Sequence, residues 1–290
     1  MEKIKTALRY PGGKSRALNQ IIPIFPKDFK EYREPFIGGG SVFINTIQKE
    51  ENKNKKYWIN DLNYDLYCFW NQVKKNNNEL VQELQTKKRK TKNGKDLYYR
   101  LKEKPEEEDE FHRAIRFFIL NRITFSGLAE CGGYSNESFE KRFTDSAILR
   151  LEPLSNLLKN VKITNLDYEK VLTEKCNAGV FIFLDPPYFN VKKSKLYGKN
   201  GDLHIGFEHE RFAKVVEDCR CNWIITCDDS PEIRKLFNFA NIREWELQYG
   251  VNNRKNNTKA KRGKELFIYN LAGDSHPSFN SLISNKESEI

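Results

Sequence analysis

Short apolar runs alternate with amphipathic stretches in the first quarter of the chain. EYREPFIGGGSVFINTIQ predicts a short strand, a glycine turn and a helix that ends near Lys49. KYWINDLNYDLYCFWNQV predicts a second strand, which ends near Asp61, and a second helix. Strands that alternate with helices in this way form βαβ units, so this part of the chain belongs to a mostly parallel sheet.

The same alternation returns in the last third of the chain. VKITNLD, VFIFLDPPY and NWIITCDD each run from apolar residues to an acid, which predicts strands, and HERFAKVVEDCR and SPEIRKLF predict the helices that accompany them. REWELQYGV and KELFIYNL predict an antiparallel pair. We therefore predict an α/β fold with a mostly parallel sheet and an antiparallel C-terminal hairpin.

The region from about Val73 to Leu158 has a different pattern, which is charged and mostly helical. It contains a basic run at 87–90, whose role stays open. The simplest organisation is a sheet domain made of residues 1–72 and 159–272, interrupted by an inserted helical domain at 73–158. Residues 273–290 are polar and predict a flexible tail.

The strand predicted at 180–184 ends in the sequence DPPY. Prolines cannot donate to a sheet and they restrict φ, so the chain leaves the sheet along a rigid path. Ligands of open α/β sheets bind at this carboxyl edge. Because a lone Asp-Pro is most often an ordinary turn, a function for Asp185 depends on what else lies at the same edge.

A glycine turn at 38–41 lies between a strand and a helix, where bare backbone allows a cofactor to approach closely. Gly38 and Gly40 match the first two positions of the dinucleotide motif GxGxxG, but Phe43 occupies the third, which disfavours NAD. Asp61 ends the next strand about 20 residues later, where an acid can bind ribose hydroxyls. Capping of the following helix is the alternative for Asp61. The pattern predicts a ribose-bearing cofactor other than NAD.

A second glycine element, RYPGGKSR, ends like a phosphate-binding P-loop, but Leu8 stands where that motif needs its first glycine. No P-loop is therefore predicted. Lys14 follows two flexible residues and can bring a cation to a carboxylate or a phosphate, with a solvated lysine as the alternative.

The segments RYPGGKSR, EPFIGGG, IND, NLDY and DPPY, in this order, resemble the Dam-like, D12-class N6-adenine DNA methyltransferases over about residues 7–270. The resemblance implies a Rossmann-like fold that binds S-adenosylmethionine (SAM), with an inserted domain that recognises double-stranded DNA. It implies that Asp61 binds the ribose of SAM and that Asp167 and Tyr168 bind its adenine ring. The remaining cofactor residues implied by the resemblance, most of them at the methionine end, are Tyr10, Gly13, Lys14, Glu34, Pro35, Phe36, Gly38, Gly40 and Asp185.

The same resemblance gives DPPY a chemical role. An exocyclic adenine amine is a poor nucleophile because its lone pair is delocalised into the ring. The Asp185 carboxylate and the Pro186 carbonyl are expected to accept its two N–H groups and to direct the lone pair at the methyl group, while Pro187 stiffens the turn. The base must leave the duplex, and stacking on Tyr188 returns roughly 1–3 kcal/mol. An RNA adenine methylase and a catalytically silent DNA-binding protein remain as alternatives.

FFILNRITFSGLAECGGYSNESFEKRF resembles the start of the target-recognition hairpin of this family. Its predicted base or phosphate contacts, with a purely structural hairpin as the alternative, are Arg122, Ser126, Tyr134 and Asn136. GGYS departs from the pattern of GATC-specific members, so the recognition sequence stays open. The basic loop 252–264 predicts phosphate contacts through Arg254, Lys255 and Arg262.

Composition fits this picture. The net charge of +10 is typical of a protein that binds a polyanion. Six cysteines form no CxxC pair and four histidines complete no zinc spacing, so we predict free thiols and no metal. No segment approaches the roughly 18 apolar residues of a membrane span, so we expect a cytoplasmic protein without membrane contact. The sequence leaves open whether the protein acts alone or together with a cognate restriction endonuclease.

Overall fold

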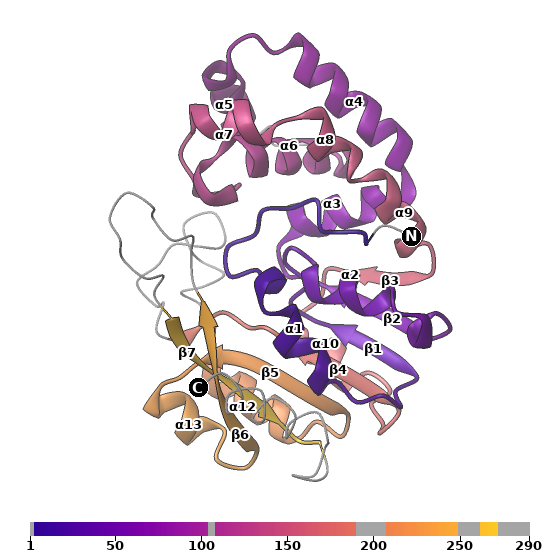
Figure 1. The fold of residues 1–290 in the computed structure, drawn as a ribbon, viewed down its shortest axis with the longest axis vertical. Helices are drawn as coiled ribbons and strands as arrows, with labels where there is room; N and C mark the ends of the chain where they lie inside the picture. The colour runs from indigo at the N-terminus through magenta and orange to yellow at the C-terminus, as the bar shows by residue number, and fades with distance from the viewer. Residues whose placement is uncertain (1–2, 104–107, 190–206, 249–261, 272–290) are drawn as a thin grey trace, which may run out of the picture.

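The computed structural model describes residues 3–103, 108–189, 207–248 and 262–271 (Figure 1). Its seven-stranded sheet has the order β3-β2-β1-β4-β5-β7-β6. The five parallel strands are β1 (Glu31–Glu34), β2 (Lys56–Asn60), β3 (Val161–Thr164), β4 (Val180–Leu184) and β5 (Asn222–Asp228), and the antiparallel pair is β6 (Asn241–Gln248) and β7 (Arg262–Tyr269). This arrangement confirms the predicted fold class.

Strand β4 lies in the middle of the sheet and is buried on both faces, as its continuous apolar sequence predicts. Phe181 and Phe183 pack into one core cluster, while Val180, Ile182 and Leu184 pack into another on the opposite face. Chain order reverses at β1 and β4, which are direct neighbours. Ligands of open α/β sheets bind at the carboxyl ends of the strands beside such a reversal.

Helices cover both faces of the sheet (Figure 1). The helical segments around the sheet are η1 (Lys14–Arg16), α1 (Leu18–Ile21), η2 (Ile22–Ile24), α2 (Ser41–Ile47), η3 (Glu50–Asn52), α3 (Tyr64–Lys75), α10 (Tyr168–Thr173), α12 (His209–Glu217) and α13 (Pro231–Leu236). Three of them begin at side-chain caps directly after strands, because Asn63, Asp167 and Ser230 accept hydrogen bonds from the first turns of α3, α10 and α13.

The helical region lies against one end of the sheet domain, at the top of Figure 1. It contains α4 (Asn77–Lys90), α5 (Gly94–Lys102), α6 (Glu110–Ile123), η4 (Phe125–Gly127), α7 (Asn136–Arg142), α8 (Asp145–Leu149) and α9 (Glu152–Leu158). Helix α6 packs along α3, where the rings of Phe69 and Phe118 stack 6.0 Å apart, and Arg116 donates to buried Asp65 at 2.7 Å. The division into domains at residue 73 stays a prediction, and α3 crosses it.

The prediction of free thiols is wrong for two of the six cysteines, because Cys176 and Cys221 form a disulfide. They are 45 residues apart, but each precedes one of the adjacent parallel strands β4 and β5, so they meet at the amino edge of the sheet. The thiol of Cys219 lies 3.6 Å from the sulfur of Cys176. The described helices include none that is long and apolar enough to cross a membrane.

Candidate active site

A cavity of about 950 Å³ opens at the carboxyl edge of the parallel strands. All predicted cofactor and DPPY residues line it: Tyr10, Gly13, Lys14, Glu34, Pro35, Phe36, Gly38, Gly40, Asp61, Asp167, Tyr168, Asp185, Pro186, Pro187 and Tyr188. They come from segments far apart in the sequence, which the parallel strands bring to one place. Arg211, Asp228 and Lys264 also line this cavity.

The Asp185 carboxylate at the end of β4 is held by two partners. The Lys14 ammonium donates to both of its oxygens, at 2.6 and 2.8 Å, and the Thr226 hydroxyl donates to Oδ1 at 2.9 Å. Lys14 is only 3% exposed, and its ammonium also donates to the carbonyl of Gly12. The ion pair therefore fastens the N-terminal glycine turn to β4, and Lys14 is not a solvated lysine.

Tyr188 is held between Lys14 and a residue that the sequence did not single out. Its hydroxyl donates to Glu265 on β7 at 2.9 Å, and the Lys14 ammonium lies 4.9 Å from its ring centroid. Glu265 is fully buried, and burial raises its pKa to about 7 although Lys14 opposes the shift. The sequence feature that could have pointed to Glu265 is its place as the one acid in the otherwise apolar strand segment ELFIY.

The turn after β1 needs glycine at two positions. Gly38 and Gly40 have φ values of +45° and +68°, and a Cβ on Gly38 would lie 2.8 Å from the Tyr10 ring. Asp61 closes the turn by accepting the backbone N–H of Gly38 at 3.0 Å. Burial raises the pKa of Asp61 to about 6. Helix capping, the alternative for Asp61, is performed by Asn63 instead.

The far end of the cavity is aromatic. The rings of Phe36 and Tyr168 lie 5.7 Å apart, and the Arg211 guanidinium lies 5.2 Å from the Tyr168 centroid. Asp167 caps α10 and also accepts hydrogen bonds from Arg211 at 3.2 Å. Phe36 and Tyr168 therefore give the cavity an aromatic lining, against which a flat, uncharged ring system with polar edges can pack.

The profile of the D12 class N6 adenine-specific DNA methyltransferases matches residues 10–251. The chain belongs to this family. Relatives include the type II methyltransferase M.MjaIII of Methanocaldococcus jannaschii, which is 32% identical over 67% of this chain and 73% of its own length. The type II methyltransferase M1.LlaDCHI of Lactococcus lactis subsp. cremoris is 28% identical over 93% of this chain and 98% of its own. The DNA adenine methylase of Escherichia coli K12 is 30% identical over 65% and 66%. The chain is thus an adenine-specific DNA methyltransferase, as the motif order predicts.

The predicted hairpin contacts occupy unlike environments. Arg122, at the end of α6, is only 4% exposed, and its Nε has no hydrogen-bond partner among the described residues. Ser126 is exposed at the strained tip, with φ +55°. Tyr134 donates to exposed Asn136 at 2.9 Å, so these two pair with each other. Arg254 and Lys255 lie outside the described residues, and of Arg262 only the backbone is described, at the start of β7.

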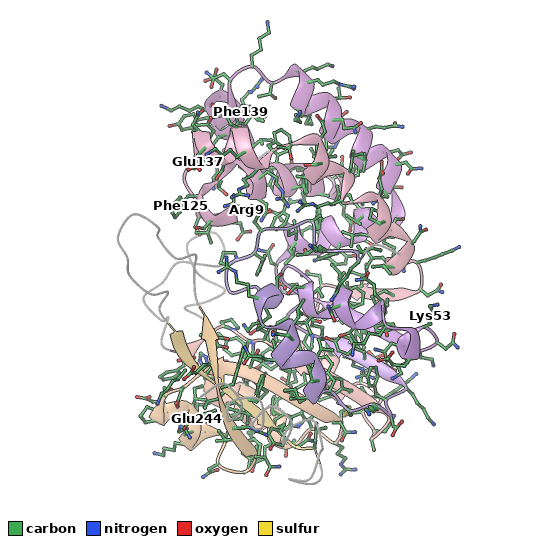
Figure 2. The ribbon with its side chains drawn as sticks, viewed as in Figure 1. Arg9, Lys53, Phe125, Glu137, Phe139 and Glu244 are labelled. Carbon is green, nitrogen blue, oxygen red and sulfur yellow. A yellow bond between two sulfur atoms is a disulfide. The ribbon has the colours of Figure 1, made fainter. Side chains whose placement is uncertain are left out.

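Two further residues of this region escaped the sequence analysis. Phe125 is 69% exposed beside Ser126, and Arg9 donates to the carbonyl of Thr124 and the hydroxyl of Ser138. Figure 2 shows Phe125 and Arg9 on the same side of the helical region, near the sheet domain. Burial and the neighbouring cations Arg9, Arg150 and Arg142 lower the pKa of Arg122 to about 9.

Proposed function

We propose that this protein transfers the methyl group of SAM to N6 of an adenine that is flipped out of double-stranded DNA. The observation that carries the proposal is the single cavity in which the glycine turns, the acids and DPPY meet. Gly13 and Gly38 pack so closely against Tyr10 that a Cβ would collide with it, and all three residues line the part of the cavity where we place the methionine part of SAM. Glu34, Asp61 and Asp185 supply acidic groups around a cationic ligand, and the aromatic lining of Phe36 and Tyr168 suits its adenine.

Asp185 is the group that we propose to orient the target amine. Oδ1 already accepts from Lys14 and Thr226, whereas Oδ2 accepts from Lys14 and retains a lone pair. Oδ2 and the carbonyl of Pro186 are then the two acceptors for the N6 hydrogens. SAM, when bound, supplies an electrophilic methyl group on a cationic sulfur. The protein contributes fixed acceptors and a rigid turn, so it accelerates transfer by orientation and electrostatics.

On the DNA side, we propose that an arginine cluster contacts phosphates. The cluster consists of buried Arg122 with Arg9, Arg142 and Arg150 around it, and exposed Arg142 and Arg150 are the members that we propose to contact phosphates. Among the described residues no acid forms an ion pair with any of the four. Cations that lower one another's pKa repel one another, and a polyanion stabilises them because its negative charge offsets this repulsion.

The hairpin tip completes the proposed DNA contact. Phe125 presents an exposed apolar ring at the tip, which suits stacking against an exposed base or base step. The loop 252–264, through Arg254, Lys255 and Arg262, is proposed to add phosphate contacts, and Ser126, Tyr134 and Asn136 to approach the duplex edge. A restriction endonuclease of the same specificity would be a partner in a restriction-modification system.

The experiment is transfer of labelled methyl from SAM to three substrates, namely adenine-containing duplex DNA, structured RNA, and a duplex without adenine. The proposal predicts label in the first substrate and at most traces in the others. Equal labelling of RNA would favour the RNA methylase, and binding of duplex DNA without any transfer would favour a silent binding protein.

A further inference from the structure

The wall of the cavity formed by Tyr188 is supported from behind by a strand outside the DPPY turn. Tyr188 donates its hydroxyl proton to Glu265 Oε2 at 2.9 Å, and its ring faces the Lys14 ammonium. Glu265 lies on β7, where its backbone pairs with Asp228 on β5 and with Trp245 on β6. A residue bound between two strands is a rigid support.

A carboxylate at this position is costly. The next four residues of β7, at 266–269, are apolar and at most 6% exposed, and Glu265 itself is fully buried. The charged groups that act on it include Lys14, Asp185 and Asp228. Burial, together with the acids Asp185 and Asp228, raises its pKa to about 7, while Lys14 and the hydrogen bond from Tyr188 favour its charged form. A buried carboxylate costs more here than an apolar residue would, and the described contact that it makes with the cavity wall is the hydrogen bond from Tyr188.

We propose that Glu265 is a positioning residue that fixes the Tyr188 ring as one wall of the part of the cavity that receives the flipped adenine. The inference rests on the proposed function, because this part of the cavity matters only if a base enters it. Glu265 does not line the cavity, so it acts through Tyr188 and not on SAM. The proposal therefore predicts a change in turnover without a change in cofactor affinity.

The test is a double-mutant cycle on the full chain with Glu265→Ala and Tyr188→Phe. Each single variant should lower kcat about tenfold, the equivalent of one hydrogen bond, while the Kd for SAM stays within about twofold. The double variant should lose no more than the slower single variant, because both changes break the same contact. Glu265→Gln, which keeps an acceptor oxygen, should recover kcat to within about threefold of the parent.

The matched control is Glu244→Gln on the neighbouring strand β6, where the carboxylate pairs with Arg234 at 56% exposure. It should leave kcat unchanged. Three results would each overturn the inference. They are a double variant in which the two losses of kcat add, full activity of Glu265→Ala, and weaker SAM binding by Glu265→Ala. If Glu265→Ala does not fold, Tyr188→Phe and Glu265→Gln are measured instead. An unchanged kcat in Tyr188→Phe overturns the inference on its own. An inactive parent protein would instead overturn the proposed function.

Discussion

Replacing Lys14 with Met removes one buried cation and keeps most of the length and shape of the side chain. The ammonium donates two hydrogen bonds to Asp185, at 2.6 and 2.8 Å, and it also lies near Glu265, whose pKa burial raises. Removing one partner of a buried pair typically costs about 3–5 kcal/mol, because the other charge is left uncompensated. We expect the lower end, about 3 kcal/mol, because Asp185 keeps Thr226 and is 21% exposed.

The assay is urea unfolding at pH 7.5, followed by circular dichroism. Lys14→Met should lower the free energy of unfolding by about 3 kcal/mol, and Lys14→Met/Asp185→Asn should regain most of that loss because no unpaired charge remains. Lys162→Met is the matched control, because Lys162 pairs with Glu174 at 46% and 47% exposure and should cost at most about 1 kcal/mol. A loss in Lys14→Met no larger than in this control, or a double variant no more stable than Lys14→Met, would refute the reasoning.

Three further predictions follow from the site, the arginine cluster and the disulfide. Because the pKa of Asp61 is raised to about 6, its carboxylate is ionised above that pH, and calorimetry should show that SAM affinity rises as the pH passes through 6. Asp61→Ala should lose ~1.5–3 kcal/mol of SAM binding free energy and should also lose this pH dependence. Arg142→Ala/Arg150→Ala should weaken binding to cognate and scrambled duplexes alike and flatten the salt dependence by up to ~0.9 log units per contact, and a selective loss on cognate DNA would contradict the phosphate assignment. Thiol titration of the unfolded, unreduced chain should find four free cysteines, and six would exclude the Cys176–Cys221 bond.

The strands and their ends were predictable because their sequences are local signals. Apolar runs that stop at Asp61, Asp167 and Asp185 mark the carboxyl edge, and a parallel sheet necessarily brings such ends together. The glycine turn at Gly38 was equally local, since its φ value is one that glycine adopts without strain. Motif order then predicted SAM as the cofactor, a choice that spacing alone left open.

What the sequence did not show depends on contacts between distant segments. The ion pair of Lys14 with Asp185 spans 171 residues. Arg122 is buried at the end of α6 and Phe125 is exposed in η4, although both residues belong to one short, mostly apolar stretch in the sequence. Glu265 was missed because a single acid in a strand is ordinarily a solvent-facing residue of an alternating pattern.

Direct identification of the product tests the central claim, namely that Asp185 and the DPPY turn present an adenine amine to SAM. Duplex DNA is incubated with SAM and the protein, digested to nucleosides and analysed by mass spectrometry, in parallel with Asp185→Asn. The account predicts N6-methyldeoxyadenosine with the parent protein and a loss of at least about a hundredfold with the variant, while SAM still binds. Methylated cytosine as the product, or near-normal turnover by Asp185→Asn, would contradict it.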